Sequence, residues 1–260
     1  MAPCSEGGGG LHQTTVHNLA MVLRIALGAA LDVGLIAKNP AAVRKTIPPA
    51  SPREMLTWEP EECQRFLAVC KGDPQEVLFH FALATGCRQG EIQALRWSAV
   101  DLTRGTVSIK ASMSAGRRKR TKTESGERLL RLPPYLVNML AEYKAKRRVV
   151  RLDQDEPVFA NLAGNEFSGC NLRVRHMEPL MRKAQVRRIR FHDLRHTFAT
   201  LMLRNGVPVK DVAYMLGHAD AATTIRVYAH AIPSTHGAHA VLIGSLLAPG
   251  STPAASSRQG

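Results

Sequence analysis

Cysteine is scarce in this 260-residue chain, and its spacing argues against two kinds of site. Five cysteines without a CxxC pair suit neither a zinc knuckle nor a disulfide framework, and they favour a reducing, intracellular compartment. No uninterrupted apolar run reaches the roughly 18 residues of a membrane span, so we expect no membrane partner. The first residues also lack the basic-then-apolar order of a signal peptide. The cysteines are Cys4, Cys63, Cys70, Cys87 and Cys170.

Acidic residues are few relative to basic ones. Against 35 Lys and Arg stand 21 Asp and Glu, which gives a formal net charge of +14 and an isoelectric point near 10.1. An excess of this size is typical of proteins that bind a polyanion. The alternative, that the charge serves only solubility, stays open on composition alone.

Composition and periodicity divide the chain into five segments. Residues 1–10 contain four consecutive glycines and are predicted to be a flexible lead-in. Residues 11–45 have helical periodicity but are few for an independent domain, and residues 46–56 contain three prolines and are predicted to be a linker. The main domain is predicted over 57–247, followed by a disordered tail of small and polar residues over 248–260.

Within the main domain the pattern predicts a mainly α fold with a small antiparallel β-sheet, an α+β class. Pro60 suits the first position of a helix, and a second helix is expected over 75–85, ended by Gly86. Strands are expected over 106–109 and 129–132, separated by a long basic loop over 114–128. A helix follows over 134–148, and the pattern from 168 onward is nearly all helical, with stops at Gly206 and Gly217.

Five short segments carry residues suited to breaking a DNA strand without metal or ATP. The transition state of a phosphodiester spreads negative charge over its non-bridging oxygens, and planar arginine donors match that charge best. A nucleophile, a base and an acid for the leaving 5′ oxygen complete the set. The segments are Thr85-Gly86-Cys87-Arg88-Gln89-Gly90-Glu91-Ile92, Thr121-Lys122-Thr123-Glu124-Ser125, Phe191-His192-Asp193-Leu194-Arg195-His196-Thr197-Phe198-Ala199, Leu216-Gly217-His218 and Tyr228-Ala229-His230.

In this order and spacing, the segments resemble the motifs of the tyrosine recombinase (phage integrase) family. The resemblance covers residues 55–247 well and residues 11–45 loosely. It implies the catalytic fold of DNA breaking-rejoining enzymes and a site-specific recombinase that cleaves and rejoins duplex DNA through a 3′-phosphotyrosine. It also implies that no cofactor or metal is needed, and that the protein is cytoplasmic and nucleoid-associated in a bacterium or derived from a phage or other mobile element.

The resemblance also assigns roles to single residues. Arg88 and Arg195 would clamp the scissile phosphate, and His218 would donate a further hydrogen bond to it. Lys122 would protonate the leaving 5′ oxygen. His192 would act as general base or as a phosphate donor, and Tyr228 would be the nucleophile. Glu91 would support Arg88, although it could instead begin a solvated helix face.

Each assignment has a plainer alternative. Tyrosines at helix ends are usually core residues, and only the accompanying motifs single out Tyr228. His192 and His196 are four apart on a helix and could be mistaken for a zinc pair. No third ligand stands out nearby, so we expect no metal and interpret His196 as a packing or supporting residue.

Two basic runs are predicted to contact the DNA backbone. Such contacts would supply affinity and strong salt dependence but little sequence discrimination. A solvated loop is the alternative for the first run. The predicted contacts are Arg117, Arg118, Lys119 and Arg120 in the first run, and Arg187, Arg188 and Arg190 in the second.

The chain departs from the family pattern at its N-terminus. Members usually have a complete helical core-binding domain there, and residues 11–45 resemble only its last helices, so we interpret this region as the remnant of a truncated domain. An apolar stretch from Ala238 to Leu247 could dock into a neighbouring copy and link a homo-tetramer on DNA, or fold back onto its own core. Two other functions stay open: DNA relaxation of the type IB topoisomerase kind, and a catalytically idle DNA-binding remnant.

Overall fold

The computed structural model describes residues 11–42, 55–114, 116–120, 126–146, 156–160 and 167–232. The chain separates into two compact units, residues 1–54 and residues 55–260. The first unit contains helix α1 (Gln13–Asp32) and a short 3-10 turn η1 (Pro40–Ala42). No residue of α1 is buried, and its apolar Val22 and Ile25 are 64% and 69% exposed.

Helix α1 has the length and apolar composition of a membrane span, which the sequence criterion did not detect. Among the described residues it is the one helix long and apolar enough to cross a membrane by length and composition. The sequence criterion of an uninterrupted run missed it because His17, Asn18 and Arg24 break the run. Core helices and signal sequences pass the same test, so this pattern by itself assigns no location.

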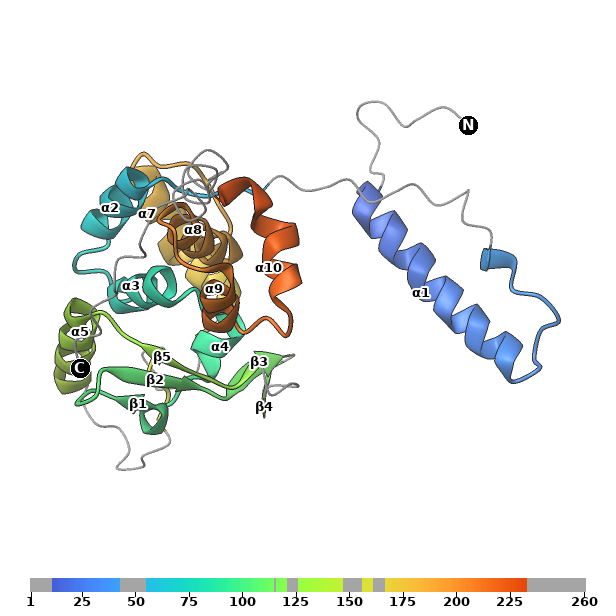
Figure 1. Cartoon of the computed structure of the whole chain (residues 1–260), viewed down its shortest axis with the longest axis horizontal. Coiled ribbons are helices and arrows are strands. Elements are labelled where there is room, and N and C mark those ends of the chain that lie inside the picture. The colour runs from blue at the N-terminus through green and yellow to red at the C-terminus, as the bar shows by residue number, and fades with distance from the viewer. Residues whose placement is uncertain are drawn as a thin grey trace, which may run out of the picture. The chain divides into compact units, whose positions relative to one another are not determined.

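The second unit contains the remaining described elements (Figure 1). Its helices are α2 (Pro60–Val69), α3 (Glu76–Thr85), α4 (Gln89–Ala94), α5 (Pro134–Lys146), α6 (Gly169–Asn171), α7 (Glu178–Lys183), α8 (Phe191–Arg204), α9 (Val209–Leu216) and α10 (Ala221–Tyr228), with a π-helical turn η5 (Leu172–Met177) and 3-10 turns η3 (Trp97–Ala99) and η6 (Ala229–Ala231). Its strands are β1 (Val100–Asp101), β2 (Thr106–Ile109), β3 (Ala111–Ser114), β4 (Arg117–Arg120) and β5 (Arg128–Arg131). The mainly α fold with a small antiparallel sheet is confirmed.

A three-stranded antiparallel sheet of order β1-β2-β5 lies on one side of this unit, and helices α2, α3, α8, α9 and α10 gather on the other (Figure 1). Val107 and Ile109 of β2 are buried and pair with Leu130 and Arg128 of β5. Alternate residues of a strand face the same side, so Arg128 occupies a core position while Leu129 is 56% exposed. The strand predicted over 129–132 is present one residue earlier, as β5, and its first residue is the buried Arg128.

The long basic loop predicted over 114–128 is wrong in part. Strands β3 and β4 form a separate antiparallel hairpin, with Ala111 opposite Arg120 and Ser114 opposite Arg117. The hairpin packs closely on α4: a Cβ built on Gly90 would lie 2.6 Å from Ser112 Oγ and 2.7 Å from the Met113 carbonyl oxygen. Glycine at position 90 therefore lets the hairpin lie directly against α4, the helix that follows Arg88.

Candidate active site

Arg195 is held by the ends of two helices. It lies in the first turns of α8 and is 3% exposed. One terminal nitrogen donates to the Gly86 carbonyl at 2.9 Å, at the end of α3, and the other donates to the Leu216 carbonyl at 2.7 Å, at the end of α9. The last carbonyls of a helix have no partner within the helix and carry partial negative charge, so they suit a guanidinium. Both helices end at glycines in the left-handed conformation, Gly86 and Gly217, where the sequence predicted helix ends.

Arg88 lies beside it at the start of α4. Its Nη1 is 2.9 Å from Oε1 of Glu91, and its Nη2 donates to the Gly217 carbonyl at 3.4 Å. The backbone N–H of Arg88 donates to Oε2 of Glu91 at 2.8 Å, so the same carboxylate also caps the helix. The Arg88 side chain is 39% exposed. One arginine is thus buried and the other open to a ligand.

The two guanidiniums create a site that favours an anion. Burial, followed by the nearby Arg88 charge, lowers the pKa of Arg195 to about 10. Two like charges held together repel each other unless an anion lies between them. A phosphate diester supplies such an anion, and forked donors match its oxygens.

Glu91 is held ionised by a residue that the sequence did not single out. Arg128 reaches its two carboxylate oxygens at 2.8 Å and 3.2 Å, and the side chains of the pair are 0% and 2% exposed. Burial would raise the pKa of Glu91, but Arg128, together with Arg88, holds it below its usual value. Arg128 Nε also donates to the Met215 carbonyl at 2.7 Å, in the last turn of α9. The interpretation that Glu91 supports Arg88 therefore fits the geometry.

His218 lies between α9 and α10. Its Nδ1 is 2.7 Å from the hydroxyl of Thr224, which is fully buried in α10. Burial and the charges of Arg195 and Arg88 lower the pKa of His218 to about 4, so the ring is neutral at pH 7. With Nδ1 engaged by Thr224, Nε2 is the nitrogen available for a phosphate oxygen.

Tyr228 is the last residue of α10 and is 1% exposed. Its hydroxyl is 2.7 Å from Nδ1 of His196 on α8. Burial raises the pKa of Tyr228 to about 12, although the charges of Arg195 and Arg88 pull it down. The tyrosine therefore lies within the field of both arginines of its own chain, with its proton in place at pH 7.

His192 lies one turn before His196 on α8. The two rings meet edge to face with centroids 4.8 Å apart, and His192 is the more exposed of the pair. The partial burial of its ring, followed by the Arg195 charge, lowers its pKa. His192 therefore lies toward the open side of the site, whereas His196 faces the tyrosine.

The structure gathers most of the residues that the motifs predicted. Arg88, Glu91, His192, Arg195, His218 and Tyr228 meet around the ends of α3, α8, α9 and α10. Lys122 lies outside the described residues, as does the stretch from Ala238 to Leu247. Sequence reasoning missed Arg128 and gave His196 only a supporting role. Arg128 could have been suspected because it falls on the same face of its strand as Leu130 and Leu132.

The basic residues predicted to contact DNA have varied surroundings. Arg117, Arg118 and Lys119 are exposed on β4, where Arg118 Nε donates to the Ala94 carbonyl at 3.2 Å, while the Arg120 side chain lies outside the described part. In the second run the guanidiniums already have carboxylate partners: Arg187 with Glu62 at 2.7 Å, Arg188 with Glu178 at 2.8 Å and Arg190 with Asp193 at 2.7 Å. DNA contact stays a prediction for both runs. The ion pairs of the second run give its arginines a structural role that does not depend on DNA.

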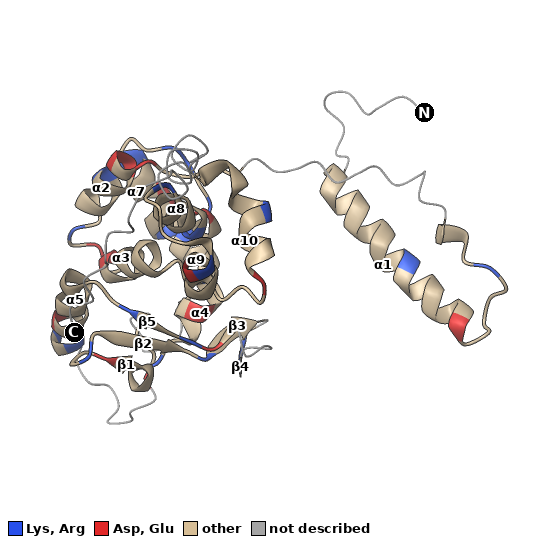
Figure 2. Cartoon of the chain, in the orientation of Figure 1, with Lys and Arg blue, Asp and Glu red and all other residues tan. Residues whose placement is uncertain are grey.

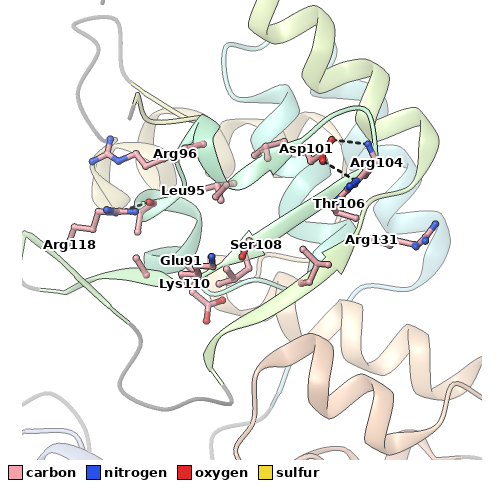
Figure 3. Close-up of a pocket in the computed structure, with 17 residues that line it drawn as sticks. Glu91, Leu95, Arg96, Asp101, Arg104, Thr106, Ser108, Lys110, Arg118 and Arg131 are labelled. Atoms are coloured by element: carbon pink, nitrogen blue, oxygen red, sulfur yellow. Dashed lines mark hydrogen bonds and ion pairs between the residues drawn. The ribbon is translucent and has the colours of Figure 1, made fainter. Parts of the chain in front are cut away.

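A separate cavity lies beside the site (Figure 3). It has a volume of about 810 Å³ and is lined by α4, η3 and strands β1 to β5. Glu91 and Arg118 line it, whereas Arg195, His218 and Tyr228 do not. The cavity is therefore distinct from the arginine pair. Within the described part of the chain, no group of three His, Cys, Asp or Glu side chains could hold a metal ion.

Comparisons with known proteins bear on this geometry. A family model described as the phage integrase family matches residues 57–234. A XerC-like tyrosine recombinase from Caldanaerobacter subterraneus subsp. tengcongensis is 29% identical over 251 residues, which are 86% of this chain and 64% of that relative. The ICEBs1 integrase of Bacillus subtilis is 25% identical over 237 residues, with the same two shares of 86% and 64%. This chain thus spans less than two thirds of the length of these curated relatives.

Solved structures show the same fold. The Tn1549 transposon integrase, in complex with a circular intermediate DNA, superposes with a TM-score of 0.75 at 20% identity and covers 90% of this chain and 80% of its own. The catalytic domain of the bacteriophage HP1 integrase superposes with a TM-score of 0.52 at 23% identity, over 77% of this chain and 99% of that domain.

Proposed function

This chain belongs to the phage integrase family, and from that premise we propose that it is a site-specific recombinase that breaks and rejoins duplex DNA through a 3′-phosphotyrosine at Tyr228. The observation that carries the proposal is the position of the Tyr228 hydroxyl. It is buried, as Arg195 is, and lies within the electric field of Arg195 and of the more exposed Arg88. A core tyrosine without a role would not need two guanidiniums beside it.

The chemistry follows from the charges on the site. Arg88 and Arg195 would bind the non-bridging oxygens of the scissile phosphate, and neutral His218 would donate from Nε2. The Tyr228 oxygen would attack phosphorus, forming one P–O bond while the bond to the 5′ oxygen breaks. Hydrogen-bond donors held in place before the reaction stabilise the charge that develops on the phosphorane. Because a phosphotyrosine ester replaces a phosphodiester, a 5′-hydroxyl can reverse the step without an external energy source.

Lys122 is proposed as the acid for the leaving 5′ oxygen. It lies between Arg120, the last residue of β4, and Arg128, the first residue of β5, whose guanidinium contacts Glu91. Six residue steps separate Lys122 from Arg128, so Lys122 is at most about 20 Å along the chain from a residue that contacts Glu91. An ammonium on a flexible stem can give up a proton more readily than a guanidinium.

The partner is proposed to be duplex DNA, in the cytoplasm and nucleoid of a bacterium. The Tn1549 integrase structures contain DNA, as does the XerH recombinase bound to difH. A homo-tetramer on DNA, linked through Ala238 to Leu247, is proposed on the apolar character of that stretch. The segment over 11–45 is proposed to belong to a helical core-binding domain.

The test is covalent trapping of the cleaved strand. The protein is incubated with a nicked duplex whose cleavage releases a short strand that diffuses away, and adducts are resolved on a denaturing gel. We expect an adduct with the wild type and none with Tyr228→Phe, since the variant keeps the ring but lacks the attacking oxygen. Folded protein that binds duplex DNA without forming an adduct would refute the proposal in favour of an idle remnant. Relaxation of supercoiled DNA without exchange between two sites would favour a topoisomerase.

A further inference from the structure

The hydroxyl of Tyr228 has one histidine partner, and it is not the histidine that the sequence motif favoured. Nδ1 of His196 lies 2.7 Å from the phenol oxygen, and the two rings are 5.6 Å apart. His192, the residue predicted as general base, instead meets His196 edge to face. We propose that His196, and not His192, holds the Tyr228 hydroxyl in position and accepts its proton during attack on the phosphate. This inference rests on the function proposed above.

The two histidines on α8 lie at different depths, which suits them to different roles. They are four residues apart and therefore share a face of the helix, so both reach the same side of the unit. His192 is the more exposed and lies nearer the open side, where a DNA phosphate would approach. His196 lies deeper, between His192 and the tyrosine ring. A base must lie within hydrogen-bond distance of the proton it removes, and His196 meets this requirement.

At pH 7 both groups are in the protonation states from which the transfer starts. Burial, and then the neighbouring His192, lower the pKa of His196 to about 4 although the charge of Asp193 raises it, which leaves the ring neutral at pH 7. A neutral imidazole has one acceptor nitrogen. The proposed transfer requires the tautomer with the ring proton on Nε2, in which the Tyr228 hydroxyl, protonated at pH 7, donates to Nδ1. The hydrogen bond fixes the direction of the O–H bond before any substrate arrives.

The proposed step is balanced. As the Tyr228 oxygen forms its bond to phosphorus, its proton passes to Nδ1 of His196, giving a transient imidazolium. The bond from phosphorus to the 5′ oxygen breaks, and Lys122 supplies the proton to that oxygen. In the rejoining step the imidazolium returns its proton to the phenol oxygen as the phosphotyrosine bond breaks. No oxidant, metal or other reactant is required.

Variants of His196 separate this role from simple packing. His196→Ala removes the acceptor, and His196→Asn places an amide oxygen near the position of Nδ1 that accepts a hydrogen bond but is a far weaker base. In single-turnover trapping with the nicked duplex, we expect His196→Ala to cleave about 10²- to 10⁴-fold more slowly than the wild type, the usual contribution of a positioned base. His196→Asn should recover only the part of this loss that comes from positioning. DNA affinity should stay within threefold of the wild type.

A second substrate identifies which proton transfer is affected. Replacing the bridging 5′ oxygen with sulfur gives a leaving group that needs no acid. We expect the Lys122→Ala defect to disappear with this substrate and the His196→Ala defect to persist. Loss of the His196 defect with the sulfur substrate would place His196 on the leaving-group side and overturn the proposal. So would a His196→Ala variant that cleaves the ordinary substrate within threefold of the wild type.

The matched control is His176→Ala. His176 is also a partly buried histidine, but it bonds to Asp73 instead of an active-site group, and its loss should leave cleavage unchanged. If His196→Ala does not fold, nitrogen-15 NMR of histidine side chains tests the contact without it. The Nδ1 resonance of His196 should move toward the free-acceptor position in Tyr228→Phe, and an unmoved resonance would refute the hydrogen bond. A wild type that forms no adduct would instead refute the proposed function, and with it any kinetic role of His196.

Discussion

Arg128 shows how much of the site depends on a single side chain that never faces the substrate. It is fully buried, bonds both oxygens of Glu91 and reaches the last turn of α9. Glu91 in turn binds the guanidinium and the backbone of Arg88. A chain of ion pairs therefore runs from the sheet to the arginine that would meet the phosphate.

Replacing Arg128 with a methionine of similar length tests this chain. Arg128→Met leaves a buried carboxylate with one cation fewer, and we expect a loss of about 3–5 kcal/mol in the free energy of unfolding at pH 7. Urea denaturation followed by circular dichroism measures it. Arg131→Met is the matched control, because Arg131 is exposed on the same strand and should change stability by less than about 0.5 kcal/mol.

The same pair predicts a dependence on pH. The pKa of Glu91 is held below its usual 4.5 in the folded protein, so the stability it contributes is present above pH 4.5 and is lost as the pH falls below that value. The difference in stability between the wild type and Arg128→Met should therefore shrink in acid. A difference that stays constant as the pH falls from 7 to 3, or one equalled by Arg131→Met, would contradict the role given to Arg128.

At the residue scale, the sequence predicted the residues that lie in the motifs and missed those whose role depends on contacts between distant segments. Arg88, Arg195, His218 and Tyr228 were predicted because their residue types and spacing are typical of the family. Arg128 was missed because an arginine in a strand ordinarily points to solvent, and only the register with β2 places it inside. The contact between His196 and Tyr228 joins two helices and has no local signal.

At the scale of elements, the ends of α3 and α9 form the floor of the site. Both end in left-handed glycines, and the carbonyls there bind Arg195 and Arg88. Helix ends were predictable, because glycine after an apolar run is a local signal. The hairpin β3–β4 was not predicted, although its pairing is local, because the run of basic side chains on β4 is typical of a loop.

Gly86→Ala tests the end of α3. Gly86 has a φ of 61°, and a Cβ there would clash with the ring of Phe198. We expect a loss of about 1–2 kcal/mol from the left-handed backbone and about 1–3 kcal/mol more from the clash, measured by thermal or chemical unfolding.

Gly206→Ala is the matched control for that variant. Gly206 has a φ of 79°, with nothing within 4 Å of the added Cβ, so it should show only the backbone cost. Equal losses in the two variants would mean that the contact between the end of α3 and Phe198 is not tight. Cleavage should also slow in Gly86→Ala, since the carbonyl of residue 86 accepts from Arg195.

At the scale of the whole molecule, the charge of +14 is the feature that the proposed binding to DNA would use. Figure 2 shows basic segments over many elements of the second unit, whereas α1 has one arginine and one acidic residue. Strand β4 carries four consecutive basic residues next to the segment that contains Lys122. We therefore expect the hairpin, more than α1, to supply electrostatic affinity.

Replacing Arg117, Arg118 and Arg120 with alanine tests that expectation. Affinity for duplex DNA should fall by a similar factor on every sequence, and the slope of log affinity against log salt should flatten by about 2–3. Fluorescence anisotropy over a salt series measures both. Lys146→Ala, which removes a cation at the end of α5, is the control. An unchanged slope in the triple variant would mean that the hairpin does not touch phosphate.

The central claim is the covalent bond at Tyr228, and mass spectrometry of the trapped adduct tests it most directly. Trypsin cleaves after Arg226 and Arg258, so residues 227–258 form a peptide in which Tyr228 is the sole tyrosine. After nuclease digestion, we predict that this peptide carries a nucleotide joined through its 3′ phosphate and that fragmentation places it on residue 228. A nucleotide on any other residue, or an adduct that survives in Tyr228→Phe, would contradict the account.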